Sequence, residues 1–299
     1  MAVAPVIIVG MHRSGTTMLA RLLEPLGLFQ GERTSHNHEA LYFEQINDWL
    51  FRQANASWDN PTNFRFINER FKSVVIDVIG RYLRGIRRVD FLGLRKALRY
   101  ADIRDIDVPW GWKDPKNTFT VGIWKAVFPA AKILHIYRNP LDVAESLRLR
   151  ERKLMEGFRI PLTKQAKDFL VLRRRILPSL SFRIQDIRQG VELWEQYVAE
   201  AFAAGRAYEA DTLQVRYESF LDAPEQTLER VVNFIDLPVQ PSAIRAAVRD
   251  VRADRKYAFA ANPELLALYD EIKHRAVMRT LGYSAIVETE ARAMAALIE

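Results

Sequence analysis

The feature that most constrains this chain is a glycine-containing loop near its start, set between an apolar run and an amphipathic segment. Residues 6–9 read Val-Ile-Ile-Val and are apolar on both faces, as a buried parallel strand requires. Beyond the loop, apolar side chains recur at helical spacing: Met18, Leu19, Leu22, Leu23 and Leu26. A strand, a loop and a helix form the first half of a βαβ unit, so an α/β fold is expected.

The same alternation continues along the chain. The patterns predict further strands at 107–112, 133–137 and 213–217, and helices at 117–128, 139–153 and 227–235. Neither an internal repeat nor a Gly/Ser linker interrupts the 299 residues. We therefore expect a single α/β domain over residues 1–299, in three layers around a central parallel sheet. Helical insertions are expected at about 30–110 and 150–190, on the side that would bind substrate.

Charge and cysteine content narrow the function classes. The chain has no cysteine, which excludes disulfides and thiolate metal sites, and its net charge of +7 favours an anionic partner. The excess is local, since residues 148–188 hold 12 Lys/Arg against 4 Asp/Glu. That segment fits three interpretations: an amphipathic helix on lipid, a lid over an anionic acceptor, or a solvated helix. No apolar run is long enough to span a bilayer, so a cytoplasmic protein is expected, peripheral to a membrane under the first interpretation.

The loop at residues 10–17 reads Gly-Met-His-Arg-Ser-Gly-Thr-Thr. Backbone N–H groups in such a loop, with the helix N-terminus, cradle an oxyanion. The Walker A loop that binds nucleoside triphosphates has lysine at the position of Thr16, whereas here Arg13 supplies the cation. The pattern thus predicts a phosphate site unlike that of ordinary ATP enzymes. A nucleotide kinase or hydrolase, and a basic membrane- or nucleic-acid-binding protein, remain alternatives.

Four segments carry a family resemblance. The stretch at 9–23, VGMHRSGTTMLARLL, resembles the 5′-phosphosulfate loop of sulfotransferases that use 3′-phosphoadenosine 5′-phosphosulfate (PAPS). The stretch at 136–150, IYRNPLDVAESLRLR, is similar to their 3′-phosphate signature. Residues 112–115 resemble the Lys-Asp-Pro segment of bacterial members, and 215–238 their tyrosine segment. The resemblance implies a bacterial-type, P-loop-like sulfotransferase with PAPS as the donor.

The resemblance also implies binding residues. The donor would contact Arg13, Ser14, Gly15, Thr16, Thr17, Arg138, Ser146, Arg150 and Tyr217. Chain geometry agrees in part, because Arg138 ends a predicted strand, where open α/β sheets bind ligands. Ser146 and Arg150 lie four residues apart, on one face of the predicted helix.

Catalytic roles follow from the same resemblance. Lys113 would neutralise charge on the oxygen that leaves, and a carboxylate would take the acceptor proton. Glu39 is the first candidate for this base and Glu44 the second. No metal is expected, and the acceptor would be a carbohydrate or another small hydroxyl compound rather than nucleic acid. The aromatic-rich stretch 40–66 would either stack on that acceptor or fill a core. The sequence predicts no particular oligomer.

Overall fold

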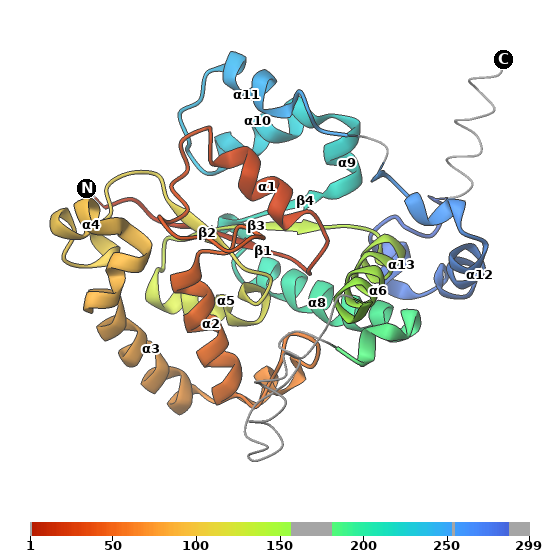
Figure 1. The fold of residues 1–299 in the computed structure, drawn as a ribbon, viewed down its shortest axis with the longest axis horizontal. Helices are drawn as coiled ribbons and strands as arrows, with labels where there is room; N and C mark the ends of the chain where they lie inside the picture. Colours follow the sequence, from red (N-terminus) through yellow and green to blue (C-terminus); the bar gives the residue numbers. More distant parts are fainter. Residues whose placement is uncertain (1, 157–180, 253–254, 287–299) are drawn as a thin grey trace.

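The structure, a computed structural model, describes residues 2–156, 181–252 and 255–286 (Figure 1). Four parallel strands form one sheet in the order β2-β1-β3-β4. They are β1 (Val6–Val9), β2 (Gly111–Lys113), β3 (Lys132–Tyr137) and β4 (Thr212–Arg216). In the register, Ile8 lies beside Lys113 on one side and Leu134 on the other, so the strands end together along one edge.

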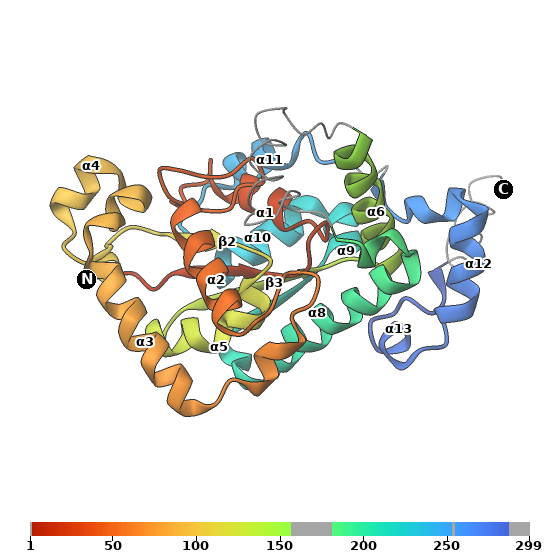
Figure 2. The ribbon, with the colours of Figure 1, turned by 60° about the horizontal axis from the view of Figure 1, so that its bottom comes forward.

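Helices cover both faces of this sheet (Figures 1 and 2). On one face lie α1 (Thr16–Leu23), α9 (Tyr217–Asp222), α10 (Pro224–Phe234) and α11 (Pro241–Val248). On the other lie α2 (Leu41–Gln53), α5 (Asn117–Val127) and α8 (Ile187–Ala207). Successive side chains of β1 alternate between the two cores: Ile8 packs with α1, and Ile7 with α2 and α5. The expected three-layer α/β fold is confirmed.

The remaining elements extend the layers. Between α2 and β2 the chain forms α3 (Glu69–Arg84), α4 (Val89–Arg99) and 3-10 turns at Thr62–Phe66, Ile86–Arg88 and Ile103–Asp105. After β3 it forms α6 (Pro140–Glu156), α12 (Pro263–Ile272), α13 (Ala276–Thr280) and turns at Arg183–Gln185, Glu209–Asp211 and Ala258–Ala261. The region 30–110 is thus helical, as expected, whereas most of the predicted insertion at 150–190 lies outside the described residues. No helix among those described is long and apolar enough to cross a membrane.

Among the element boundaries that differ from the sequence prediction by one to four residues, two lie at the edge that carries the site. The strand expected at 107–112 pairs with β1 only from Gly111 to Lys113, because Pro109 before it has no N–H to donate to a ladder. Tyr217, expected to close the last strand, is instead the first residue of α9. Lys113 is the last residue of β2 and Tyr217 directly follows β4, so both residues lie at the edge of the sheet that carries the site.

Candidate active site

The loop at 10–17 crosses the end of β1 in a conformation that requires glycine. Gly10 has φ 139°, and a Cβ there would lie 2.3 Å from the carbonyl oxygen of Ile136 on β3. The Ser14 hydroxyl donates to the carbonyls of Met11 (2.6 Å) and Ile136 (3.1 Å). Ser14 is buried, so its side chain holds the loop closed against the sheet.

The loop leads directly into the N-terminus of α1. Gly15, at φ 103°, precedes the helix, whose first turn has neither a side-chain cap nor an acidic residue. The first N–H groups of a helix have no partner within it, so they and the helix dipole favour an anion here. The Thr17 hydroxyl donates to the carbonyl of Asn37 at 3.1 Å, which ties the loop after α1 to the same place.

An open cavity of about 180 Å³ lies at this edge of the sheet. It brings together ten of the twelve residues predicted from the sequence: Arg13, Gly15, Thr16, Thr17, Glu39, Lys113, Arg138, Ser146, Arg150 and Tyr217. Ser14 and Glu44 do not line it. His12, Met18, Asn37 and Pro115 line it as well, although the sequence analysis did not select them.

One end of the cavity is formed by the end of β3 and by α6. The Arg138 guanidinium lies 4.7 Å from the centre of the Tyr217 ring and donates to Asp142 at 2.8 Å. It also donates to the carbonyl of Arg255 at 2.6 Å, a contact that no sequence pattern predicted. The Nε of Arg13 donates to the Ser146 hydroxyl at 2.8 Å, so the loop and α6 meet directly.

The cations of this end repel one another. Burial lowers the pKa of Arg13, and the nearby guanidinium groups of Arg150, Arg138 and Arg255 lower it further. Since arginine stays charged at such values, the repulsion is relieved when an anion enters between the groups.

The other end holds a buried ion pair. Lys113, the last residue of β2, donates from Nζ to Oε1 of Glu39, and only 1% and 6% of the two residues are exposed. Backbone bridging between the same two residues brings them together, and the Ser35 hydroxyl donates to the other Glu39 oxygen. Burial lowers the pKa of Lys113, while the Glu39 carboxylate opposes this shift. The two predicted catalytic groups therefore contact each other directly.

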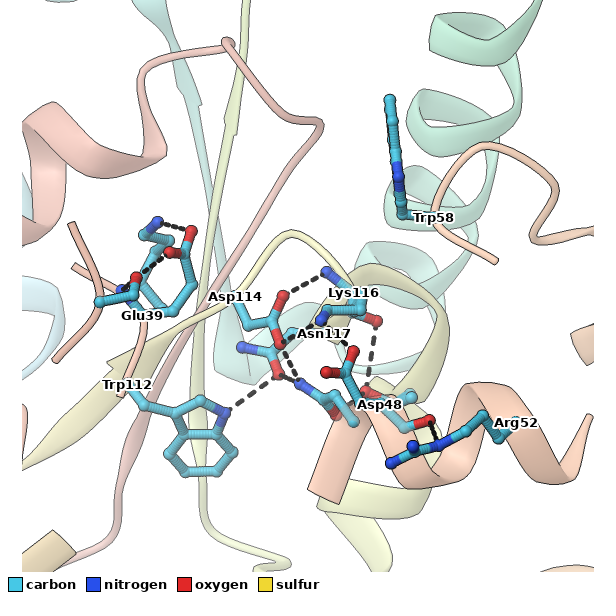
Figure 3. A network of polar contacts seen from close by, with 12 residues as sticks. Glu39, Asp48, Arg52, Trp58, Trp112, Asp114, Lys116 and Asn117 are labelled. Carbon is cyan, nitrogen blue, oxygen red and sulfur yellow. Dashed lines mark hydrogen bonds and ion pairs between the residues drawn. The ribbon is translucent and has the colours of Figure 1, made fainter. Parts of the chain in front are cut away.

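A buried polar network beneath this pair holds its segment in place (Figure 3). The Asn47 amide donates to Asp114 and to Asn117, at 2.8 Å each. The indole of Trp112 also donates to Asn117 (3.0 Å), whose own amide donates to the Ile8 carbonyl at 3.1 Å. Residues on both sides of Lys113 are thus fixed to β1 and α2. The sequence carried no signal for Asn47, because its partners lie some seventy positions away.

Glu44 lies on α2 near this network. Burial raises its pKa to about 7, with Asp114 and Glu39 adding to the rise and Lys116 opposing it. It stays outside the cavity lining.

Glu44 should make stability depend on pH. Between its ordinary pKa of 4.5 and about 7 the folded protein keeps a proton that the unfolded chain has lost, so stability falls as pH rises through that window. Relative to wild type, Glu44→Gln should therefore gain stability from about pH 4 to about pH 8, measured by urea unfolding. The control Glu229→Gln, on the exposed side of α10, should show a flat difference. A flat difference for Glu44→Gln as well would contradict the shift.

Two of the histidines, His12 and His135, have different surroundings. His12 is half-buried beside Trp58, with ring centres 5.0 Å apart, and its buried Nε2 has no partner within the described residues. Burial, with Arg150 adding, lowers its pKa well below the ordinary value, so the ring is neutral. His135 is buried in β3 and does not line the cavity. Among the described residues, no three His, Cys, Asp or Glu side chains are grouped to hold a metal ion.

Many aromatic side chains of the aromatic-rich stretch fill the core. Phe43 stacks on Trp112 with ring centres 4.0 Å apart, and Phe51 packs on Phe64 at 4.5 Å. Phe66, in contrast, is 69% exposed. Trp58 lies under the guanidinium of Arg150, which lines the active-site cavity, at 5.1 Å.

The comparison with family models agrees with this geometry. The model of the sulfotransferase family matches residues 5–241. The chain belongs to the sulfotransferase family. The matched range includes all four strands and every predicted site residue. No curated protein matches this sulfotransferase.

Solved structures resemble this sulfotransferase at low identity. The sulfotransferase domain from the curacin biosynthetic pathway is 16% identical, with 85% of this chain and 80% of that chain covered and a TM-score of 0.46. STF9 from Mycobacterium avium is 16% identical, with 91% and 77% covered and a TM-score of 0.44. The domain from the Synechococcus PCC 7002 olefin synthase is also 16% identical, with 89% and 83% covered and a TM-score of 0.43.

The basic segment at 148–188 of this sulfotransferase is described only at its two ends. Arg148 is buried and pairs with Glu145 (2.6 Å) and Glu264 (3.1 Å), and Arg150 pairs with Glu151 (2.7 Å) while lining the cavity. These two arginines belong to the interior and to the site. Residues 157–180, on which the three interpretations of this segment depend, lie outside the described part.

Proposed function

We propose that this sulfotransferase moves the sulfuryl group of PAPS to a hydroxyl of a carbohydrate or another small-molecule acceptor. The observation that carries the proposal is one cavity whose lining brings together two candidate anion sites. The uncapped N-terminus of α1 is one of them, and Arg138 with Ser146 is the other. A 3′,5′-bisphosphorylated nucleoside has two anionic groups separated by its sugar, which such a cavity can hold together.

The lining residues suggest how the donor is held. Thr16, Thr17 and the backbone from Gly15 would bind the 5′-phosphosulfate at the helix N-terminus. Arg138 and Ser146 would bind the 3′-phosphate, with Arg13 between the two candidate anion sites through its bond to Ser146. Tyr217, which already stacks on Arg138, offers a ring face for the adenine. Ser14, whose hydroxyl is engaged with the backbone, contributes by shaping the loop.

The ion pair supplies the two groups that transfer requires. The donor brings an activated sulfuryl group, whose bond to the phosphate oxygen breaks as the acceptor oxygen bonds to sulfur. Glu39 would take the acceptor proton, because each carboxylate oxygen keeps a lone pair beyond its present bond. Lys113 would neutralise charge on the phosphate oxygen that leaves. Glu44, outside the cavity lining, is the second candidate for the base, and no step needs a metal.

Calorimetry tests the donor assignment. Adenosine 3′,5′-bisphosphate should bind to the full chain more tightly than ATP with magnesium, because Thr16 replaces the lysine that triphosphates require. Arg138→Ala should weaken the bisphosphate by roughly tenfold or more and leave adenosine 5′-phosphosulfate, which has no 3′-phosphate, little affected. Tighter binding of ATP with magnesium would contradict the proposal and favour a nucleotide kinase or hydrolase. Equal losses for both ligands would contradict the role of Arg138.

The domain assignment and acceptor class are parts of the same proposal. We treat residues 1–299 as one sulfotransferase domain, since the family match and the sheet share one core. The acceptor class rests on the family and on the place of Glu39 in the cavity lining. Screening sugars and small alcohols against labelled donor tests it, and sulfation of nucleic acid or protein alone would contradict it.

A further inference from the structure

One tip of the molecule exposes apolar side chains. The tip segment (residues 86–99) consists of the 3-10 turn at Ile86–Arg88 and α4. Within the described part of the chain it holds the three most exposed large apolar residues, Leu98 (91%), Ile86 (82%) and Leu94 (75%). Figures 1 and 2 both place α4 at one end of the long axis, opposite α12. The exposed side chains are therefore free to meet a partner.

The backbone of α4 produces this exposure. In an unbroken helix, Leu94 and Leu98 would lie on the face of Phe91, three and seven residues earlier, and Phe91 is fully buried. Gly93 interrupts the helix with φ 69° and ψ 169°, a conformation that favours glycine. The interruption turns the two leucines away from the core and toward solvent.

Positive charge surrounds these leucines. Residues 81–99 contain seven Lys/Arg and one acidic residue, Asp90. Three carboxylates from outside pair with this stretch, since Asp77 contacts Arg81, Asp102 lies 3.9 Å from Arg84 and Asp107 lies 2.5 Å from Arg99. Glu32 also lies against Gly93, and Arg33 and Arg104 pair with Asp90 and Asp102. Nine cations thus face five carboxylates, and exposed pairs of this kind are weak and screened by salt. The remaining excess favours an anionic partner.

An apolar cavity adjoins the tip segment. It has a volume of about 250 Å³ between α2 and α3, and it is lined by Gln45, Ile46, Trp49, Val78, Ile79 and Tyr82. The Arg87 guanidinium donates to the side-chain oxygen of Gln45 at 3.4 Å, which places a cation at the rim of this cavity. An anionic phospholipid combines a negatively charged head group with apolar chains. The head group matches the excess of Lys and Arg at the tip segment, and the chains match its exposed apolar side chains.

We infer that the tip segment docks this protein on a membrane surface that contains anionic phospholipid. Leu94 and Leu98 enter the interface, and the surrounding cations contact head-group phosphates. A second copy of the chain fits less well, because two positive tips would face each other. A nucleic acid offers no apolar layer to receive the leucines. The inference goes beyond the proposed transfer reaction and does not depend on it.

Vesicle co-sedimentation of the full chain tests the inference at about 0.15 M ionic strength. Wild type should bind vesicles of phosphatidylcholine with phosphatidylglycerol at least about tenfold more strongly than phosphatidylcholine alone. Leu94→Ser with Leu98→Ser, and separately Arg95→Gln with Arg99→Gln, should each weaken that binding by about tenfold. All variants should keep the wild-type melting temperature and bisphosphate affinity, which shows that they are folded.

Matched controls alter equally exposed residues elsewhere. Phe182→Ser removes a 74% exposed apolar residue within the basic 148–188 segment, and Arg245→Gln with Arg249→Gln removes exposed charge on and just after α11. Both should bind vesicles like wild type. No binding by wild type, no preference for phosphatidylglycerol, or a loss only with Phe182→Ser would overturn the inference. So would a dimer, seen by light scattering, that the leucine variant abolishes in the absence of vesicle binding. Duplex DNA binding that depends on Arg95 and Arg99 but not on the leucines would likewise assign the surface to nucleic acid.

Discussion

Lys113→Met is expected to reduce sulfuryl transfer by about 10²–10³-fold and to destabilise the fold by roughly 3–5 kcal/mol. The activity falls because the leaving oxygen loses its cation. The stability falls because the Glu39 carboxylate stays buried without the partner to which it is bonded now. Turnover with saturating donor measures the first effect, and urea unfolding measures the second.

Two further variants separate these effects. Lys113→Met combined with Glu39→Gln removes both charges, so it should recover most of the stability and none of the activity. Glu39→Gln alone should lose turnover while keeping bisphosphate affinity, since Glu39 lies at the end of the cavity away from Arg138. If the double variant is no more stable than Lys113→Met, the buried charge does not explain the loss. Wild-type turnover in Glu39→Gln would remove Glu39 from the mechanism and leave Glu44 as the candidate.

Gly15→Ala is expected to weaken adenosine 3′,5′-bisphosphate binding by roughly 100-fold. A Cβ at this position would lie 2.6 Å from a ring carbon of Tyr217, so the ring or the loop must move. Either movement disturbs the N-terminus of α1 and the stack of Tyr217 on Arg138 at once. Calorimetry measures the affinity of the variant.

Gly27→Ala is the matched control for this substitution. Gly27 has φ 106°, close to the 103° of Gly15, but a Cβ there meets nothing within 4 Å. Backbone strain of about 1–3 kcal/mol should therefore lower the melting temperature of both variants. Only Gly15→Ala should also lose bisphosphate affinity, because only its Cβ meets Tyr217. Equal affinities for the two variants would show that the contact with Tyr217 does not shape the site.

Much of the fold was predictable from local pattern. The first strand was expected at residues 6–9 and is found there, and the helix expected at 117–128 is found at Asn117–Val127. Ten of twelve predicted site residues line one cavity, because parallel strands end at a common edge and Arg138 and Lys113 lie at such ends. The differences that bear on the site are at 107–112, where pairing begins late, and at Tyr217, which starts a helix.

The sequence by itself determined the strand–loop–helix order, the glycines of the loop and the face that Ser146 shares with Arg150, since each follows from spacing along one element. Only the tertiary structure decided that Lys113 pairs with Glu39, that the Ser14 hydroxyl faces inward, and that Arg138 reaches Arg255. These contacts join residues far apart in the chain, and periodicity carries no information about such partners. The sequence analysis located a charge excess only at 148–188, whereas the excess at 81–99 drew attention only in the structure, because its position next to exposed leucines depends on the backbone at Gly93.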